Sequence, residues 1–179
     1  MRKTTEQIMR VAGDRIWEYA ELTFDQIKFS PEVVEACRAN LCGNYGRCWQ
    51  CPPHVGELEE LKAEYSKYPQ AFVFTTKHSI EDSFDVEGME AARAEHEKVE
   101  DLIRPVLPRG SKVLGAGGCN VCARCAYPEP CRFPDRAKSS VEACGIDVVS
   151  LAKTAKIKYT NGENTVTYFT LVFLNGNES

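Results

Sequence analysis

The stretch IKYTNGENTVTYFTLVFL, residues 157–174, indicates that the fold is built around a β-sheet. Its second half, Val166–Leu174, is apolar enough for a strand at the centre of a sheet. The dipeptide Asn161-Gly162 favours a tight turn between antiparallel strands. The stretch therefore predicts a hairpin whose second arm is a central strand.

Other segments predict further strands and several helices around this one. Strands are expected at 23–29 (TFDQIKF), 71–80 (AFVFTTKHSI) and 111–117 (SKVLGAG). Helical spacing of apolar residues predicts helices at 4–21, 30–37, 56–68, 85–104, 140–144 and 148–155. The first of these begins with a capping box, Thr4 to Gln7, and Pro105 ends the longest.

These elements predict one α+β domain over residues 1–179. We expect a small mixed or antiparallel sheet of three to five strands, covered by helices. Two cysteine-rich, metal-binding loops, 37–56 and 118–135, project from it. A strand–helix–strand unit lies between the loops and can bring both to the same end of the sheet.

Composition and charge limit the partners. The net charge of −4 gives no general basic surface for nucleic acid. The N-terminus has no apolar signal region, and no apolar run is long enough to span a bilayer. We therefore expect a cytoplasmic protein that binds neither nucleic acid nor membrane. Because that compartment keeps thiols reduced, the nine cysteines indicate metal ligands or redox thiols rather than disulfides.

The second loop carries four cysteines within the fourteen residues GCNVCARCAYPEPC, 118–131. Cys119, Cys122 and Cys125 have the C-x2-C-x2-C spacing of bacterial ferredoxins, which lets one short loop wrap three corners of an iron–sulfur cubane. The next spacing, to Cys131, is five residues where the ferredoxin run has three. Cys131 therefore either closes the same cluster or is a ligand of another cluster.

The first loop is less regular. Its cysteines are Cys37, Cys42, Cys48 and Cys51, and only the last two form a C-x2-C pair. Cys51-Pro52 repeats the Cys-Pro step that ends ferredoxin cluster runs. Four thiols in each loop equal the ligand count of two [4Fe–4S] clusters, or of two zinc sites. The loops can also exchange ligands.

The C-x2-C-x2-C spacing of the second loop favours an iron–sulfur cluster over zinc. Structural zinc sites use two separated C-x2-C pairs, and three ligands on one tight loop crowd a tetrahedral ion. An iron–sulfur cluster is thus the leading interpretation for residues 118–135, with zinc or metal-free thiols as alternatives.

Several residues near the cysteines have both a functional and a structural interpretation. Arginines at 38, 47, 124 and 132 can stabilise an anionic cluster or simply face water. His54 is expected to be an ordinary loop residue, although it lies close enough to Cys51 to touch a cluster or substrate. Trp49 either shields a cluster or belongs to the local core. His96 is expected at a core or rim position, and Cys144 is expected as a small buried hydrophobe.

Three segments resemble a known family. YGRCWQCPPHVG (45–56), GAGGCNVCARCAYPEPCRFPD (115–135) and SSVEACGIDVVSLAK (139–153) are similar to the bacterial and archaeal "predicted metal-binding protein" family, domain of unknown function 2284. The resemblance covers residues 30–175. It implies metal binding through cysteines, a cytoplasmic setting and frequent occurrence in anaerobes. Members often occur in organisms that use corrinoid methyltransferases, which suggests low-potential redox chemistry by association only. The family supplies no established reaction or catalytic residue.

These observations leave three functional hypotheses. The first is an iron–sulfur protein with one or two [4Fe–4S] clusters that passes electrons at low potential to a protein redox partner, or reductively activates it. The second is a catalytic cluster held by three cysteines, whose open iron carries out sulfur or small-molecule chemistry. The third is a zinc-stabilised interaction module. The sequence also leaves the oligomeric state open, a homo-oligomer included.

Overall fold

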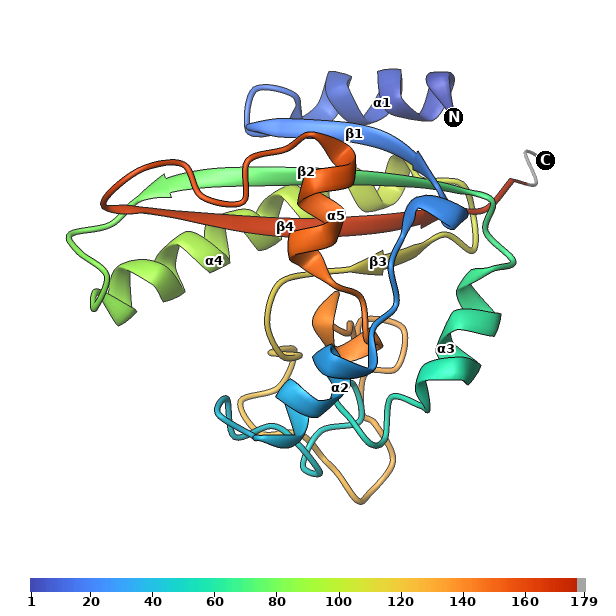
Figure 1. The fold of residues 1–179 in the computed structure, drawn as a ribbon, viewed down its shortest axis with the longest axis vertical. Coiled ribbons are helices and arrows are strands. Elements are labelled where there is room, and N and C mark those ends of the chain that lie inside the picture. The colour runs from blue at the N-terminus through green and yellow to red at the C-terminus, as the bar shows by residue number, and fades with distance from the viewer. Residues whose placement is uncertain (177–179) are drawn as a thin grey trace.

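The predicted central strand lies inside a four-stranded antiparallel sheet, and the α+β class is confirmed. The computed structural model describes residues 1–176 (Figure 1). The strand order is β1-β2-β4-β3, so β4 has a neighbour on each side. The bounds are β1 Glu18–Thr23, β2 Gln70–Ser79, β3 Lys112–Leu114 and β4 Thr165–Leu174.

Helices cover both faces of the sheet because β2 and β4 are apolar on both sides. Phe72 and Phe74 of β2 pack in one core cluster with side chains of α1 and α4. Ala71 and Val73, which point the other way, pack in a second cluster with α3 and α5. The bounds are α1 Arg2–Ala12, α3 Leu58–Tyr65, α4 Val86–Ile103 and α5 Val148–Ala155.

The remaining elements are short. A lower lobe in Figure 1 contains α2, and it carries both cysteine-rich segments. The bounds are α2 Pro31–Arg38, and the 3₁₀ turns η1 Phe24–Gln26, η2 Arg104–Val106 and η3 Glu142–Cys144.

The predicted first helix, 4–21, is wrong beyond Ala12. The chain turns at Gly13 and Asp14, and β1 begins at Glu18, inside the predicted helix. Alternation explains the change, because Leu22 is buried in the core while its neighbours on the strand are exposed. The strand predicted at 23–29 is also wrong, since β1 ends at Thr23 and Phe24–Gln26 form the 3₁₀ turn η1.

The predicted hairpin at 157–174 is also wrong in its first arm. β4 forms, but residues 157–164 are a loop in which Asn161 hydrogen-bonds Trp17 and Thr167. β4 pairs along its whole length with β2 and, on its other edge, with β3 at Leu171–Phe173 only. The antiparallel partner of β4 is therefore the distant β2, not the segment that precedes it.

No helix within residues 1–176 is both long enough and apolar enough to cross a membrane.

A buried polar chain ties α4 to β2 and β4. The Thr170 hydroxyl donates to Glu100 Oε1 at 2.7 Å, and so it accepts from His96 Nε2–H, also at 2.7 Å. His96 Nδ1 is then unprotonated and accepts from the Thr76 hydroxyl at 2.8 Å. Lys138 donates to the other Glu100 oxygen. The His96 and Glu100 side chains are fully buried, as His96 was expected to be, so each hydrogen bond replaces one that water would otherwise supply.

Removing the hydroxyl at the centre of this chain should destabilise the fold. Thr170→Val leaves His96 Nε2–H and Glu100 Oε1 without their shared partner, which costs about 1–3 kcal/mol of unfolding free energy. Urea titration of Thr170→Val measures the loss. Thr160→Val, at an exposed loop position, is the matched control and should stay within about 0.5 kcal/mol of wild type. Equal stability of both variants would contradict the network.

The same histidine should make stability depend on pH. Burial, followed by the charge of Lys138, lowers the pKa of His96 from 6.5 to about 3. Between these values the unfolded state binds a proton that the folded state does not, so stability falls as the pH drops below 6.5. The limiting slope is about 1.4 kcal/mol per pH unit. Urea titrations at several pH values should give a shallower slope for His96→Gln, and an unchanged slope would refute this assignment.

Candidate metal centre

Both cysteine-rich segments lie in the lower lobe of Figure 1, side by side. Residues 37–56 begin with the last turn of α2 and otherwise contain no helix or strand, and residues 118–135 contain none. Both segments are therefore loops, as predicted, and the strand–helix–strand unit β2-α4-β3 separates them in sequence.

The second loop leaves the sheet where β3 ends. The amide of Gly115 donates to Ser139 O, and Gly115 O accepts from the amide of Val141, so the two ends of the loop are joined. A side chain at residue 115 would collide with the Glu100 carboxylate. Only glycine therefore lets the loop base pack directly on α4.

Charged groups of α4 hold the beginning of this loop. Arg93 donates to Gly118 O, and the Asn120 amide donates to both carboxylate oxygens of Glu97 at 2.9 and 2.8 Å. Lys138 lies 3.5 Å from the same carboxylate. Burial opposes ionisation, but Asn120, Lys138 and Arg93 together lower the pKa of Glu97. The two residues flanking Cys119 are thus fixed to a rigid helix.

Sequence reasoning missed this support. Arg93 and Glu97 are four residues apart on α4, and in the sequence this spacing indicates an ordinary exposed ion pair. Asn120, a polar residue placed between two predicted ligands, was the available signal.

Aromatic side chains connect the two loops. Trp49 Nε1 donates to Glu129 O at 2.8 Å, and its ring meets Tyr127 edge-on with centroids 5.0 Å apart. His54 stacks on Tyr127 at 4.1 Å. His54 therefore contacts the opposite loop, where sequence predicted an ordinary loop residue, and Trp49 belongs to the interface between the loops.

Five predicted ligands surround one small cavity between the loops. The cavity holds about 20 Å³ of free space. Its cysteines are Cys48, Cys119, Cys122, Cys125 and Cys131. Cys48 of the first loop thus joins the four cysteines of the second loop, an exchange of ligands between loops that the sequence had left open.

Cys48 of the first loop and Cys125 of the second loop contact each other, and their pKa values shift in opposite directions. Burial, and then the neighbouring Cys125, raises the pKa of the Cys48 thiol. Partial burial opposes ionisation of Cys125, but backbone N–H groups of Tyr127 and Trp49 and the Cys48 thiol donate to its sulfur and lower its pKa. N–H groups aimed at a cysteine sulfur are the surroundings that a metal-bound thiolate requires.

The other four cysteines lie outside this cavity. Burial, and then Cys48, raises the pKa of Cys51 to about 12. Cys37 and Cys42 line a separate, larger cavity. Cys144 is fully buried and contacts the Tyr65 hydroxyl at 3.4 Å, so its predicted core position is confirmed.

The donor set fits a thiolate-bound metal, but the geometry is not preformed. Among residues 1–176, no three Cys, His, Asp or Glu side chains are arranged to hold an ion. The free space between the five thiols is that of about one water-sized sphere. Either an ion or a cubane therefore requires the thiols to rearrange.

The predicted arginines do not converge on these thiols. Arg38 pairs with Glu35, and Arg132 donates to the backbone oxygen of Arg124. Of the four, Arg132 lines the cavity.

Comparison with known proteins agrees with a metal-binding role. A family model described as "Predicted metal-binding protein (DUF2284)" matches residues 20–174. No curated protein and no solved structure matches the chain.

The aromatic contacts should control how firmly the loops hold together. Tyr127→Ala removes the ring that touches both Trp49 and His54, so amides of residues 118–135 should exchange hydrogen faster in the metal-free protein. Hydrogen–deuterium exchange with mass spectrometry measures this. Tyr159→Ala, which removes a half-exposed ring outside both loops, should leave those amides unchanged. Identical exchange in the two variants would show that the rings do not join the loops.

Proposed function

Because this chain belongs to the family of predicted metal-binding proteins (DUF2284), we propose that its two loops together hold one [4Fe–4S] cluster. The protein then transfers electrons at low potential to a protein partner, or reductively activates it.

The single observation that carries the proposal is the position of Cys48. It joins Cys119, Cys122 and Cys125 at one cavity, although it is 71 positions from the nearest of them in sequence. Three closely spaced cysteines and one remote cysteine also form the ligand pattern of ferredoxin clusters. We therefore assign these four as ligands and leave Cys131 as a fifth thiol at the same cavity.

The surroundings support a cluster that exchanges electrons. A bound [4Fe–4S] cluster supplies one-electron chemistry, and backbone N–H groups near Cys125 stabilise the added charge. Trp49, which packs against Tyr127, covers one side of the centre. Cys119, Cys122, Cys125 and Cys131 are each partly exposed, so a partner protein can approach the cluster closely.

A zinc-stabilised interaction module is the second candidate. The small cavity that the five cysteines border favours it, since a single Zn²⁺ ion bound by four thiols takes less space than a cubane. A structural zinc ion would stabilise the folded lobe and carry no redox chemistry.

Metal analysis of protein purified without oxygen separates the candidates. We expect about four irons and about four acid-labile sulfides per chain, the content of one cubane. Cys48→Ala should lose most of both, because it removes the only ligand assigned to the first loop. Cys42→Ala, an exposed thiol of the same loop, is the matched control and should keep both.

Other contents would decide against a single shared cluster. Stoichiometric zinc without sulfide would replace it by the zinc module. About eight irons and eight sulfides would mean that a second cluster forms on the remaining cysteines.

A further inference from the structure

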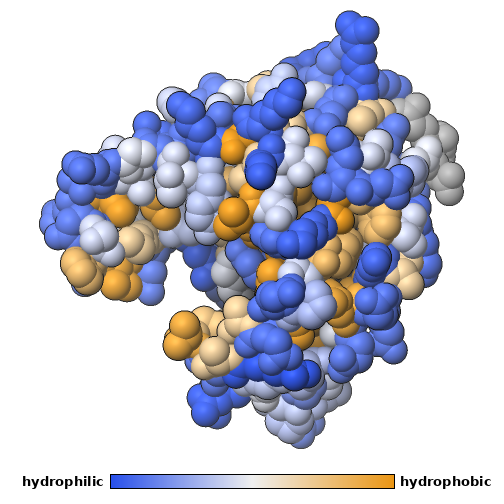
Figure 2. All heavy atoms as spheres, viewed as in Figure 1, coloured by the Kyte–Doolittle hydropathy of each residue, from blue (hydrophilic) through white to orange (hydrophobic). Residues whose placement is uncertain are grey.

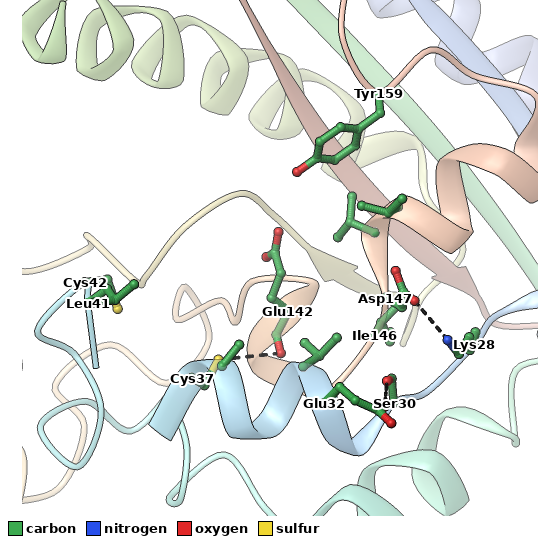
Figure 3. Close-up of a pocket in the computed structure, with 14 residues that line it drawn as sticks. Lys28, Ser30, Glu32, Cys37, Leu41, Cys42, Glu142, Ile146, Asp147 and Tyr159 are labelled. Carbon is green, nitrogen blue, oxygen red and sulfur yellow. Dashed lines mark hydrogen bonds and ion pairs between the residues drawn. The ribbon is translucent and has the colours of Figure 1, made fainter. Parts of the chain in front are cut away.

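The larger cavity, which Cys37 and Cys42 line, is an open groove. It has a volume of about 510 Å³ and is bordered by α2, the turn after it, η3, the start of α5 and the loop before β4 (Figure 3). Figure 2 shows the surface hollowed on this side, between the lower lobe and the sheet. We call this cavity the α2–α5 groove, and it is accessible to a partner from solution.

Apolar side chains form both the floor and the rim of the α2–α5 groove. Ile146 and Val148 line the floor and belong to the main core cluster. At the rim, Leu41, Val149 and Tyr159 are 96%, 59% and 51% exposed. Among residues 1–176, six large apolar side chains are more than half exposed, so half of them border this one groove. Exposed apolar side chains that gather in this way indicate an interaction site.

The charged groups around this apolar lining are acidic on balance. Glu32, Glu142 and Asp147 supply three carboxylates. Lys28 supplies the single ammonium group of the lining, and it pairs with Asp147 at 3.1 Å. The Glu142 carboxylate points into the groove toward Tyr159 and has no hydrogen-bond or ion-pair partner in the described part of the chain (Figure 3). A ligand that carries basic groups beside an apolar face is therefore complementary to the groove.

The same charges disfavour a second copy of this chain as the occupant. Outside the groove, the most exposed apolar side chains are Phe84 and Val86, at 87% and 63%. They lie in the segment 81–87, EDSFDVE, which carries four acidic residues and no basic one. Like charges that meet across an interface cost free energy. The occupant is therefore a different, basic molecule.

The exposed rim favours a protein segment over a small molecule. Small-molecule sites enclose most of the surface of their ligand. In this groove the rim side chains come from three separate segments and stand more than half exposed, so they can pack against the flanks of a larger partner. An amphipathic helix places apolar side chains at positions i, i+3, i+4 and i+7 in such a groove and keeps its charged side chains at the rim.

We propose that the α2–α5 groove is the docking site of a partner protein, which inserts the apolar face of a basic amphipathic helix. Leu41, Val149 and Tyr159 pack against that face, and a lysine or arginine of the helix pairs with Glu142. Because Leu41 belongs to the first cysteine loop, the docked partner also contacts the loop that carries Cys48. Docking requires no metal between the loops, so this inference does not depend on the proposed function.

Binding of two synthetic helical peptides to the full-length protein tests the docking site. The first peptide has leucine at positions i, i+3, i+4 and i+7 and lysine at most others, and the second has glutamate in place of every lysine. Fluorescence anisotropy of the labelled peptides gives the dissociation constants, and amide shifts of the ¹⁵N-labelled protein locate the site. The lysine peptide should shift amides within 31–42 and 146–159. The glutamate peptide should bind at least about tenfold more weakly, because its charge is that of the rim.

Two double variants identify the surface that the lysine peptide contacts. Leu41→Ser/Val149→Ser should bind it at least about tenfold more weakly, since both apolar side chains are buried on docking. Phe84→Ser/Val86→Ser is the matched control, because it removes two side chains of similar exposure outside the groove, and it should bind like wild type. Glu142→Gln should weaken binding and make it less dependent on salt, since one charge of the rim is lost.

Several results would overturn the docking site. Equal affinity for the two peptides, or no binding of either, would show that the groove does not select a basic amphipathic helix. Equal losses in the two double variants would show that the peptide adheres to exposed apolar side chains in general. If octylamine, an ammonium group on an apolar chain, shifted the same amides and neither peptide did, the groove would be a small-molecule site instead.

Discussion

The pairing of β2 with β4 is the interaction on which the rest of the structure depends. Ten residues of each strand are in antiparallel register, from Gln70 opposite Leu174 to Ser79 opposite Thr165. Both strands bury side chains on both faces, so helices must cover the sheet on either side. This requirement places α4 against one face, and α4 then fixes the start of the second cysteine loop.

The link from sheet to site is electrostatic as well as steric. Thr170 of β4 donates to the buried Glu100 of α4, and Lys138 joins Glu100 to Glu97. The Glu97 carboxylate accepts a hydrogen bond from the side-chain amide of Asn120, the residue after Cys119. A buried carboxylate is stable only with such partners, so the core and the beginning of the loop hold each other in place. The four assigned thiols themselves lie on loop segments, outside any helix or strand, which suits a centre that closes around its metal.

The sequence predicted the fold class, the central strand and the long helix because each has a strong local signal. Val166–Leu174 is predominantly apolar, and Asp85 caps α4, where its side chain accepts from the Gly88 amide. The prediction of a helix at residues 18–21 is wrong because pairing of β1 with β2 overrides their helical continuation from α1. Spacing identified the cysteines, but it could not show that Cys48 lies with Cys119, Cys122 and Cys125. That arrangement depends on contacts such as Trp49 with Glu129, which join residues 80 positions apart.

The central claim is that the two loops share one metal centre. The most direct test is a crystal structure of the protein purified without oxygen, with anomalous scattering recorded at the iron edge. The account predicts one compact group of iron atoms, bound by Cys48 together with Cys119, Cys122 and Cys125. Two separate groups, one on each loop, or one group bound by residues 118–135 without Cys48, would contradict it.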